Sequence, residues 1–243
     1  MNVIAVTQKG LNKTENEDRI IIGKTIVANG TLFSEISDGV LAVADGVGGH
    51  NAGAIASHFV SNKLCHLKEI SVDLLRAIND ELFAISETTA GQKGMATTLS
   101  GVCIDDSNTQ LFSIGNTRVY LLQSRKYLKQ LTTDDTTLNY LIATGQLSSE
   151  DAKTFERKNE ITACFGGGSS DLFKVKVSYI KPLTAPIMIT SDGIHDYLSV
   201  DQMEEIIEEH RKRGERARKY VDAIEKKKFP INAERLVHGY FKV

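Results

Sequence analysis

The sequence predicts an α+β protein in which mainly antiparallel β-sheets pack on each other and helices lie outside them. Two observations support this prediction. Short β-rich runs mostly follow one another too closely for the long crossovers that join parallel strands. Helical patterns occur in pairs between the groups of strands, which is typical of helices that cover packed sheets.

The first part of the chain predicts strands followed by two helices. The β-rich runs are residues 3–7, 18–27, 31–37 and 40–44. Asp38-Gly39, between the last two runs, is a type I′ turn signal, so we expect a hairpin there. The run 40–44 is apolar throughout, as expected of a strand buried on both faces. A glycine-rich loop follows, and helical spacing then predicts helices up to about residue 67 and over about 72–90.

The rest of the chain predicts a β meander, further helices and closing strands. The meander strands are residues 95–104, 110–115, 118–123 and 126–131. Later predicted elements are short helices near 134–144 and 148–156, strands at 173–180 and 186–190, helices near 200–212 and 215–227, and a last strand-like segment, 235–243. No linker, low-complexity tract or internal repeat divides the chain, so residues 1–243 are predicted to form one domain.

Composition excludes several classes of protein. The net charge of −2 gives no overall attraction to nucleic acid or to a membrane surface, and no 18-residue apolar run predicts a transmembrane helix. The first residues lack the basic-then-apolar order of a signal peptide. Cys65, Cys103 and Cys164 are odd in number and lack zinc-site spacing, so we expect reduced thiols. Together these features predict a cytoplasmic protein with neither nucleic-acid nor membrane partners.

Acidic residues at the ends of predicted strands are the candidate functional groups. Asp45 lies in ADGVGGH at the end of the apolar run 40–44, and Asp192 ends a second apolar strand in ITSDGIHD. A third acidic pair, Glu17-Asp18, lies in the early NED triplet. Carboxylates, backbone carbonyls and water suit hard cations such as Mg²⁺ or Mn²⁺. Two such ions can activate a bridging water and clamp a phosphoryl oxygen.

Simpler interpretations stay open at this point. Asp-Gly is first of all a turn signal, and Asp38-Gly39 is interpreted as a turn alone. The glycine-rich loop fits neither dinucleotide nor P-loop motifs, and His50 within it is equally suited to proton transfer and to helix capping. The basic run from Arg211 to Lys228 is interpreted as a solvated helix face, with an acidic or nucleic-acid partner as the alternative. No Gly-x-Ser-x-Gly elbow supports a serine hydrolase.

An ordered set of motifs resembles a known family. The motifs are NED (16–18), ADGVGGH (44–50), GMATT (94–98), IGNTRVYLL (114–122), LTTDD (131–135) and SDGIHD (191–196). In this order they resemble the bacterial branch of the type 2C metal-dependent protein phosphatases, the PPM family. The resemblance implies a four-layer αββα sandwich, two antiparallel sheets flanked by helix pairs. It also implies two Mn²⁺ or Mg²⁺ ions and a serine/threonine phosphatase that acts on phosphorylated proteins, opposed by a cognate Ser/Thr kinase.

The resemblance also implies a role for each motif residue. Asp45 would bridge the two ions, and Asp192 would serve one of them. The Gly46 carbonyl and Glu17, the latter through water, would serve the other ion. Asp18 would hold a metal-bound water, and the bridging water would attack phosphorus in line without a phosphoenzyme. Thr97 and Thr98 are expected to support the site rather than react.

Four departures from the family pattern bear on activity. Lys13 stands where the family has a phosphate-gripping arginine, and it keeps the charge but loses the two-pronged geometry. Asn116 replaces an aspartate associated with a third, loosely held metal, and Asp134-Asp135 replaces Asp-His. The family's C-terminal Asp-Asn is absent, with Asn232 or Glu234 as candidate substitutes for its metal-binding aspartate.

Two alternative functions therefore remain. The first is a catalytically weakened pseudophosphatase, which would keep the fold and bind a phosphoprotein or partner as a signalling module. The second is a metal-dependent phosphatase for small phosphate esters, since no substrate-binding loop can be identified. Substrate specificity is expected to lie in surface loops such as the helical insert 134–160.

Overall fold

The computed structural model describes residues 1–243 apart from 11–12, 48–51, 106–107, 149, 211–234 and 243. Its strands form two sheets, and every strand pair in the described residues is antiparallel, as predicted. The predicted helix near 215–227, and His50, Asn232 and Glu234, lie outside the described residues. No helix among the residues described is both long and apolar enough to span a membrane.

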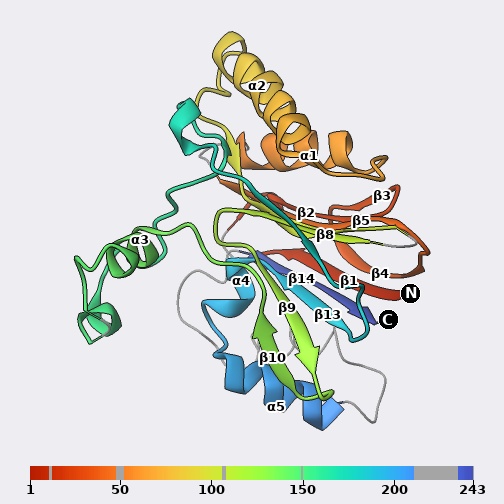
Figure 1. Ribbon diagram of the computed structural model, residues 1–243. Coiled ribbons are helices and arrows are strands. Elements are labelled where there is room, and N and C mark those ends of the chain that lie inside the picture. Colours follow the sequence, from red (N-terminus) through yellow and green to blue (C-terminus); the bar gives the residue numbers. More distant parts are fainter. Residues whose placement is uncertain (11–12, 48–51, 106–107, 149, 211–234, 243) are drawn as a thin grey trace.

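The six-stranded sheet joins the two ends of the chain. Its order is β10-β9-β13-β14-β1-β4. The strands are β1 (Asn2–Lys9), β4 (Gly30–Glu35), β9 (Arg118–Gln123), β10 (Tyr127–Gln130), β13 (Ile187–Thr190) and β14 (Arg235–Lys242). Because β14 pairs with both β1 and β13, with Asn2 opposite Lys242, the C-terminal strand lies inside the sheet and the termini lie side by side (Figure 1).

The eight-stranded sheet is built around β5 (Gly39–Val47), which pairs with β2 and β7. The other strands are β2 (Asp18–Ile22), β3 (Thr25–Val27), β6 (Ala96–Thr97), β7 (Leu99–Ile104), β8 (Thr109–Ile114), β11 (Phe165–Gly166) and β12 (Lys176–Ile180). All residues of β5 except Val47 are buried, which confirms the prediction of a strand covered on both faces.

The predicted hairpin at Asp38-Gly39 is wrong. The strand before it, β4, pairs with β1 in the six-stranded sheet, whereas β5 pairs with β2 and β7 in the other sheet. The turn therefore carries the chain from one sheet to the other, and Gly39 has the left-handed φ of 107° that favours glycine. The predicted meander likewise changes sheets, because β7 and β8 pair in one sheet and β9 and β10 in the other.

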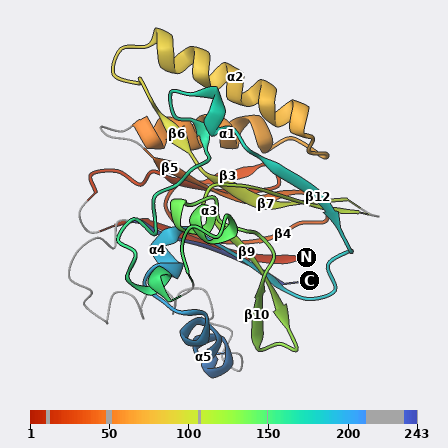
Figure 2. The same cartoon turned by 60° about the vertical axis from the view of Figure 1, so that its left-hand side comes forward.

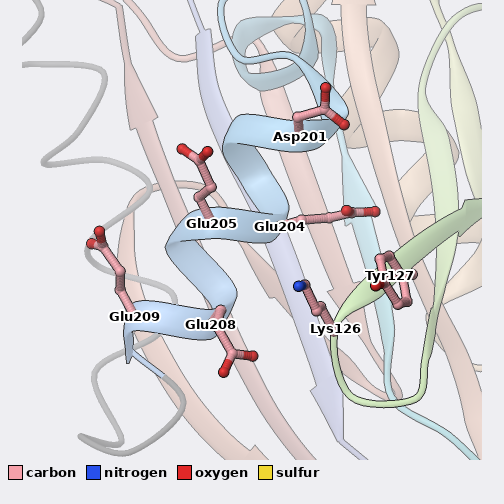
Figure 3. A pocket seen from close by; sticks show the side chains of 7 residues that line it. All are labelled: Lys126, Tyr127, Asp201, Glu204, Glu205, Glu208 and Glu209. Atoms are coloured by element: carbon pink, nitrogen blue, oxygen red, sulfur yellow. The ribbon is translucent and has the colours of Figure 1, made fainter.

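Helices connect groups of strands along the chain. Their bounds are α1 (Ala52–Leu64), α2 (Val72–Thr88), α3 (Thr137–Ala143), η1 (Asp151–Thr154), η2 (Ser170–Leu172), α4 (Asp192–His195) and α5 (Val200–His210). Figures 1 and 2 show α1 and α2 together beyond the eight-stranded sheet, and α5 at the opposite end of the molecule. The amide of Leu128 in β10 donates to Glu204 Oε1 at 2.7 Å. This bond ties α5 to the six-stranded sheet beside Tyr127 (Figure 3).

Three groups of buried apolar side chains hold these elements together. One joins α1 and α2 to the eight-stranded sheet through residues such as Val60, Leu75, Leu82, Ala42 and Phe112. A second contains residues from both sheets, including Ala5, Ile20, Val43, Val119 and Ile189. A third joins the six-stranded sheet to α5 through Tyr120, Met188, Met203 and Ile207. Apolar burial of this kind is the main force that stabilises the fold.

Candidate metal centre

Two buried carboxylates face each other across neighbouring strands. Asp18 begins β2 and Asp45 lies near the end of β5, and the register places the two residues directly opposite each other. Their exposed fractions are 0% and 1%. Side chains directly opposite in an antiparallel pair are close neighbours, so two like charges there destabilise each other. A bound cation would offset this repulsion, since it would supply the opposite charge.

Glu17 lies where its own segment of the chain packs closely against Gly46 and Gly53. The Gly46 amide donates to the Glu17 carbonyl at 3.1 Å, and the Ser57 hydroxyl donates to the same oxygen. A Cβ at Gly46 would lie 2.6 Å from that carbonyl oxygen, and one at Gly53 would lie 2.9 Å from Glu17 Oε1. Only glycine leaves room for this approach. The close packing therefore holds the Glu17 carbonyl beside Gly46 and the buried Glu17 carboxylate beside Gly53.

Lys13 reaches the same carboxylate. Its Nζ lies 2.9 Å from Glu17 Oε2, and the ammonium group is half-buried. Lys13 lies four residues before Glu17, which is the position at which the family resemblance implies a cation. Lys13 thus places a positive charge at the edge of the carboxylate group.

Asp192 follows a strand of the six-stranded sheet. It begins α4 directly after β13, and the preceding residue, Ser191, donates from Oγ to Asp18 Oδ2 at 3.5 Å. The Nδ2 atom of Asn116 donates to Asp192 Oδ2 at 3.4 Å. The residue that replaces the family's third-metal aspartate is therefore in contact with Asp192.

Thr97 and Thr98 hold the backbone of Asp45. The Thr97 hydroxyl donates to the Asp45 carbonyl at 3.0 Å, and the Thr98 amide donates to the same oxygen at 2.8 Å. The Thr98 hydroxyl in turn bonds the Thr117 hydroxyl. These contacts agree with the expected supporting role, because both donors fix the main chain rather than the carboxylate.

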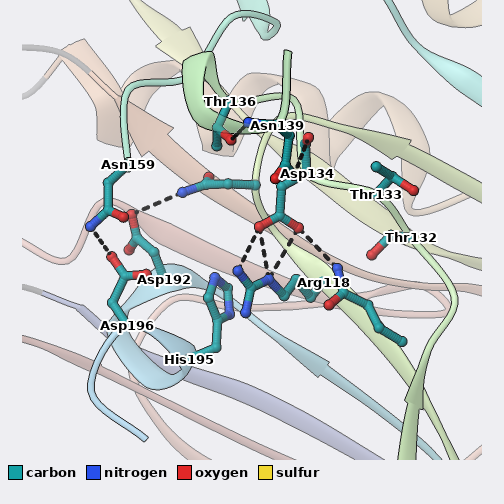
Figure 4. Close-up of polar contacts among 12 residues, drawn as sticks. Arg118, Thr132, Thr133, Asp134, Thr136, Asn139, Asn159, Asp192, His195 and Asp196 are labelled. Atoms are coloured by element: carbon teal, nitrogen blue, oxygen red, sulfur yellow. Dashed lines mark hydrogen bonds and ion pairs between the residues drawn. The ribbon is translucent and has the colours of Figure 1, made fainter. Parts of the chain in front are cut away.

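Figure 4 shows a partly buried ion pair, Arg118 with Asp134, that the sequence analysis did not single out. Arg118 donates from Nε to Asp134 Oδ2 at 2.9 Å and from its terminal NH2 to the same atom at 2.6 Å. Burial works to lower the pKa of Arg118, but the hydrogen bonds and charge of Asp134, together with Tyr120, outweigh burial and raise that pKa. Gln130 also donates to Asp134, at 3.0 Å. The pair anchors the loop that carries Asn116.

His195 and Asp196 complete this side of the centre. The buried His195 bonds Thr190 Oγ1 through Nδ1 at 2.8 Å, and burial together with the positive charge of Arg118 lowers the pKa of His195 well below its ordinary value. Asp196 is exposed as a whole residue, but partial loss of water around its carboxyl group, with the negative charge of Asp192, raises its pKa to about 6. Asn159 donates to Asp196 Oδ2 at 2.6 Å across 37 residues of sequence, a contact that no spacing signal predicts.

The donor chemistry fits hard divalent ions. Carboxylates and a backbone carbonyl meet here in a buried setting, which is what Mg²⁺ and Mn²⁺ prefer. Among the described residues, no three Asp, Glu, His or Cys side chains are grouped so that they could hold one metal ion. Mg²⁺-type ions usually keep several waters and are bound by one or two carboxylates, so two facing carboxylates are compatible with such an ion.

The α+β fold and the buried carboxylates define the class, a protein with a candidate site for divalent metal ions. Comparisons with known proteins identify the family. No family model matches the chain. The serine/threonine phosphatase stp of Listeria monocytogenes serotype 4b (strain F2365) is 30% identical over 228 residues, which cover 87% of this chain and 84% of the relative. Protein phosphatase PhpP of Streptococcus pneumoniae (strain D39) is 26% identical over 85% of this chain.

Solved structures agree with this relationship. The serine/threonine phosphatase PstP/Ppp of Mycobacterium tuberculosis matches with a TM-score of 0.80 at 24% identity, over 100% of this chain and 99% of that one. The catalytic domain of PstP in complex with two manganese ions matches with a TM-score of 0.75 at 25% identity, again over 100% and 99% of the two chains. The chain belongs to the family of bacterial 2C-type serine/threonine protein phosphatases, which are metal-dependent phosphoric monoester hydrolases.

Proposed function

We propose that this chain removes phosphate from phosphoserine and phosphothreonine in phosphorylated proteins, and that it does so with two Mn²⁺ or Mg²⁺ ions. The observation that supports this proposal most directly is the buried pair of Asp18 and Asp45, opposite each other on β2 and β5. Glu17 and Gly46 lie at the same strand ends, and Ser191, the neighbour of Asp192, contacts Asp18 from the other sheet. The two manganese ions described for PstP support the number and type of ions.

Each residue of the centre has a role in this proposal. Asp45 would contact both ions, the Gly46 carbonyl and Glu17 would serve one ion, and Asp192 would serve the other. When bound, the two ions would make a bridging water a better nucleophile and neutralise charge on the phosphoryl oxygens. Asp18 would accept a hydrogen bond from water at the centre, and Thr97 and Thr98 would keep the Asp45 main chain in place.

Lys13 would bind the phosphate of the substrate. Its Nζ is held 2.9 Å from Glu17, so the positive charge stays at the edge of the centre. A lysine offers a point charge, whereas an arginine offers two parallel N–H donors that match a phosphate. We therefore expect weaker binding of the phosphate group than an arginine at this position would give.

A pseudophosphatase is the second candidate function. Asn116 places an amide against Asp192 where the family has a carboxylate, and Lys13 replaces the phosphate-gripping arginine. In this alternative the chain binds a phosphoprotein without consuming it. Phosphate release distinguishes the two functions, because only the first predicts turnover.

The proposal extends to the architecture and setting of the protein. The three apolar groups support four layers in the order αββα, with residues 1–243 as one domain, because they join α1 and α2 to the eight-stranded sheet, the two sheets to each other, and the six-stranded sheet to α5. A single cooperative unfolding transition is expected, and two separate transitions would contradict one domain.

Cys65, Cys103 and Cys164 are all free and buried, which supports a reducing, cytoplasmic compartment with a cognate Ser/Thr kinase as the opposing activity. Recovery of the native protein with any of the three thiols in a disulfide would contradict that compartment.

The experiment that tests the function measures phosphate release from a phosphothreonine peptide across a Mn²⁺ titration, repeated with Mg²⁺. We expect saturable release that EDTA abolishes. Asp45→Ala should lower kcat/KM at least about a hundredfold, because charge stabilisation at the reacting group is commonly worth that much. Asp80→Ala, which removes an exposed carboxylate on α2, is the matched control and should keep full activity.

Two outcomes would contradict the proposal. Retained turnover in a folded Asp45→Ala variant would exclude Asp45 as a metal ligand. Absence of release by the unmodified chain at millimolar Mn²⁺, with peptide binding intact, would favour the pseudophosphatase. Parallel assays with p-nitrophenyl phosphate would show whether small esters are hydrolysed better than the peptide, as expected of a phosphatase for small phosphate esters.

A further inference from the structure

A polar cavity of about 220 Å³ lies beside the proposed metal centre. It is bordered by α3 and the segment around Asn159 on one side and by His195 and Asp196 on the other (Figure 4). Asn116, which also lines the cavity, contacts Asp192. The cavity therefore adjoins a residue that the proposed function assigns to a metal, so a group bound there would lie next to the reacting phosphate.

Three of the lining residues are asparagines, and we call the cavity the asparagine pocket after Asn116, Asn139 and Asn159. Each uses its Nδ2 group within the protein. Asn116 donates to Asp192 at 3.4 Å, Asn139 to the Asp134 carbonyl at 3.0 Å and Asn159 to Asp196 at 2.6 Å. Within the described part of the chain, no hydrogen bond is made to Oδ1 of any of the three. Each amide thus keeps a carbonyl oxygen that can accept a hydrogen bond.

The charges around the asparagine pocket balance. Arg118 is paired with Asp134. The positive charge of Lys158 works to lower the pKa of Asp196, which stabilises its carboxylate. His195 is neutral at physiological pH, because burial and Arg118 hold its pKa low. A lining with two cations, two carboxylates and acceptor oxygens carries no net attraction for an isolated phosphate or for a cationic side chain. It suits an uncharged group that donates N–H bonds.

We propose that the asparagine pocket binds the peptide main chain of a phosphoprotein substrate, directly next to the phosphorylated residue. Main-chain N–H groups are uncharged donors, and a carboxamide oxygen is a good acceptor for them. The inference rests on the proposed function, since it places the phosphate at the carboxylates beside Asp192. It identifies Asn139 and Asn159 as residues that distinguish a peptide substrate from a small ester.

The test compares a phosphothreonine peptide with p-nitrophenyl phosphate, which has no main chain. Asn139→Ala and Asn159→Ala should each lower kcat/KM for the peptide about three- to tenfold, the usual effect of one lost hydrogen bond. Turnover of the small ester should be unchanged. Asn62→Ala, which removes an exposed asparagine of α1, is the matched control and should alter neither substrate.

Modified peptides test the same contact on the unmodified protein. Phosphothreonine peptides that are N-methylated at one flanking position at a time lose a single N–H donor. One such peptide should bind more weakly to the unmodified chain, and the penalty should disappear in Asn139→Ala or Asn159→Ala. Equal affinity for all of the peptides would overturn the inference, as would a loss in the alanine variants that is the same for both substrates.

Failure of the inference and failure of the proposed function give different results. If the unmodified chain hydrolyses neither substrate, the phosphatase function fails. Isothermal titration calorimetry with the N-methylated series then still shows whether the pocket binds the main chain. If the small ester is hydrolysed but the asparagine variants treat the peptide like the unmodified chain, only the pocket is excluded.

Discussion

At Gly46 the chain leaves no room for a side chain. A Cβ there would lie 2.6 Å from the Glu17 carbonyl oxygen and closer still to the Gly53 backbone, and neither backbone group can rotate away. Gly46→Ala should lower the free energy of unfolding by about 1–3 kcal/mol, the usual effect of overpacking. It should also weaken metal binding, because Glu17 and Asp45 would be pushed apart. Chemical denaturation and Mn²⁺ calorimetry measure the two effects.

Gly145→Ala is the control for this substitution. A Cβ at Gly145 meets nothing within 4 Å, although its φ of 70° is left-handed. The change should therefore lower stability only by the backbone strain, about 1–2 kcal/mol, and leave Mn²⁺ affinity unaltered. Unchanged Mn²⁺ affinity in Gly46→Ala would show that the close approach at Gly46 does not position the carboxylates.

His195 predicts a dependence of stability on pH. Its folded-state pKa is depressed, so below about pH 6.5 the unfolded chain binds a proton that the folded chain does not. This group therefore stabilises the folded state above about pH 6.5 and loses that contribution as pH falls. In EDTA, the stability of the wild type relative to His195→Asn should fall below pH 6.5 by up to about 1.4 kcal/mol per pH unit. A difference that stays constant from pH 7.5 to 5 would contradict the buried neutral imidazole.

Asp196 acts in the opposite sense and serves as the internal comparison. Its folded-state pKa is raised to about 6, so its contribution is fully present below about pH 4 and is lost as pH rises through 6. The stability of the wild type relative to Asp196→Asn should therefore rise as pH falls through 6. The two variants must show opposite trends over the same pH range.

At the scale of elements, α2 illustrates how a local signal sets a boundary. Ser71 precedes the helix in an extended conformation, and its hydroxyl accepts from the Leu74 amide at 3.1 Å. The buried residues Leu75, Ile78 and Leu82 then follow at helical spacing. The cap and the apolar face agree, so the predicted span of about 72–90 is close to the observed Val72–Thr88.

The cap of α2 can be tested alone, because Ser71 is exposed. Ser71→Ala should lower the free energy of unfolding by about 1 kcal/mol, the usual effect of a lost N-cap. Ser71→Asp, which keeps an acceptor oxygen, should retain the stability of the wild type. Equal destabilisation by both substitutions in urea denaturation would argue against capping as the cause.

At the scale of the whole molecule, β14 connects the two ends of the chain. It pairs along its length with β1 and also with β13, so it holds the six-stranded sheet together. Deletion of residues 235–243 would leave the edges of β1 and β13 unpaired in the middle of that sheet. The shortened chain should show no cooperative unfolding transition, whereas deletion of Val243 alone should leave the transition unchanged. Cooperative unfolding of the shortened chain, followed by circular dichroism, would contradict this role of β14.

The positions of the helices and strands were predicted well, but the pairing partners of the strands were not. Strand and helix positions follow from side-chain periodicity, which is a property of neighbouring residues. Asp38-Gly39 was assigned to a hairpin because the dipeptide specifies a turn, yet a turn does not specify which strands pair. The Arg118–Asp134 pair and the Asn159–Asp196 bond escaped prediction for a similar reason, since side-chain contacts between separate segments leave no periodic signal.

The sequence by itself determined the types of element, the strand-end carboxylates and the resemblance to 2C-type phosphatases. These features depend on local composition and on the order of short motifs, which are readable without a fold. Only the tertiary structure decided that Asp18 lies opposite Asp45, that Ser191 contacts Asp18 and that three asparagines line one cavity. Those relations depend on strand register and sheet order, which are set by burial and hydrogen bonding between segments distant in the chain.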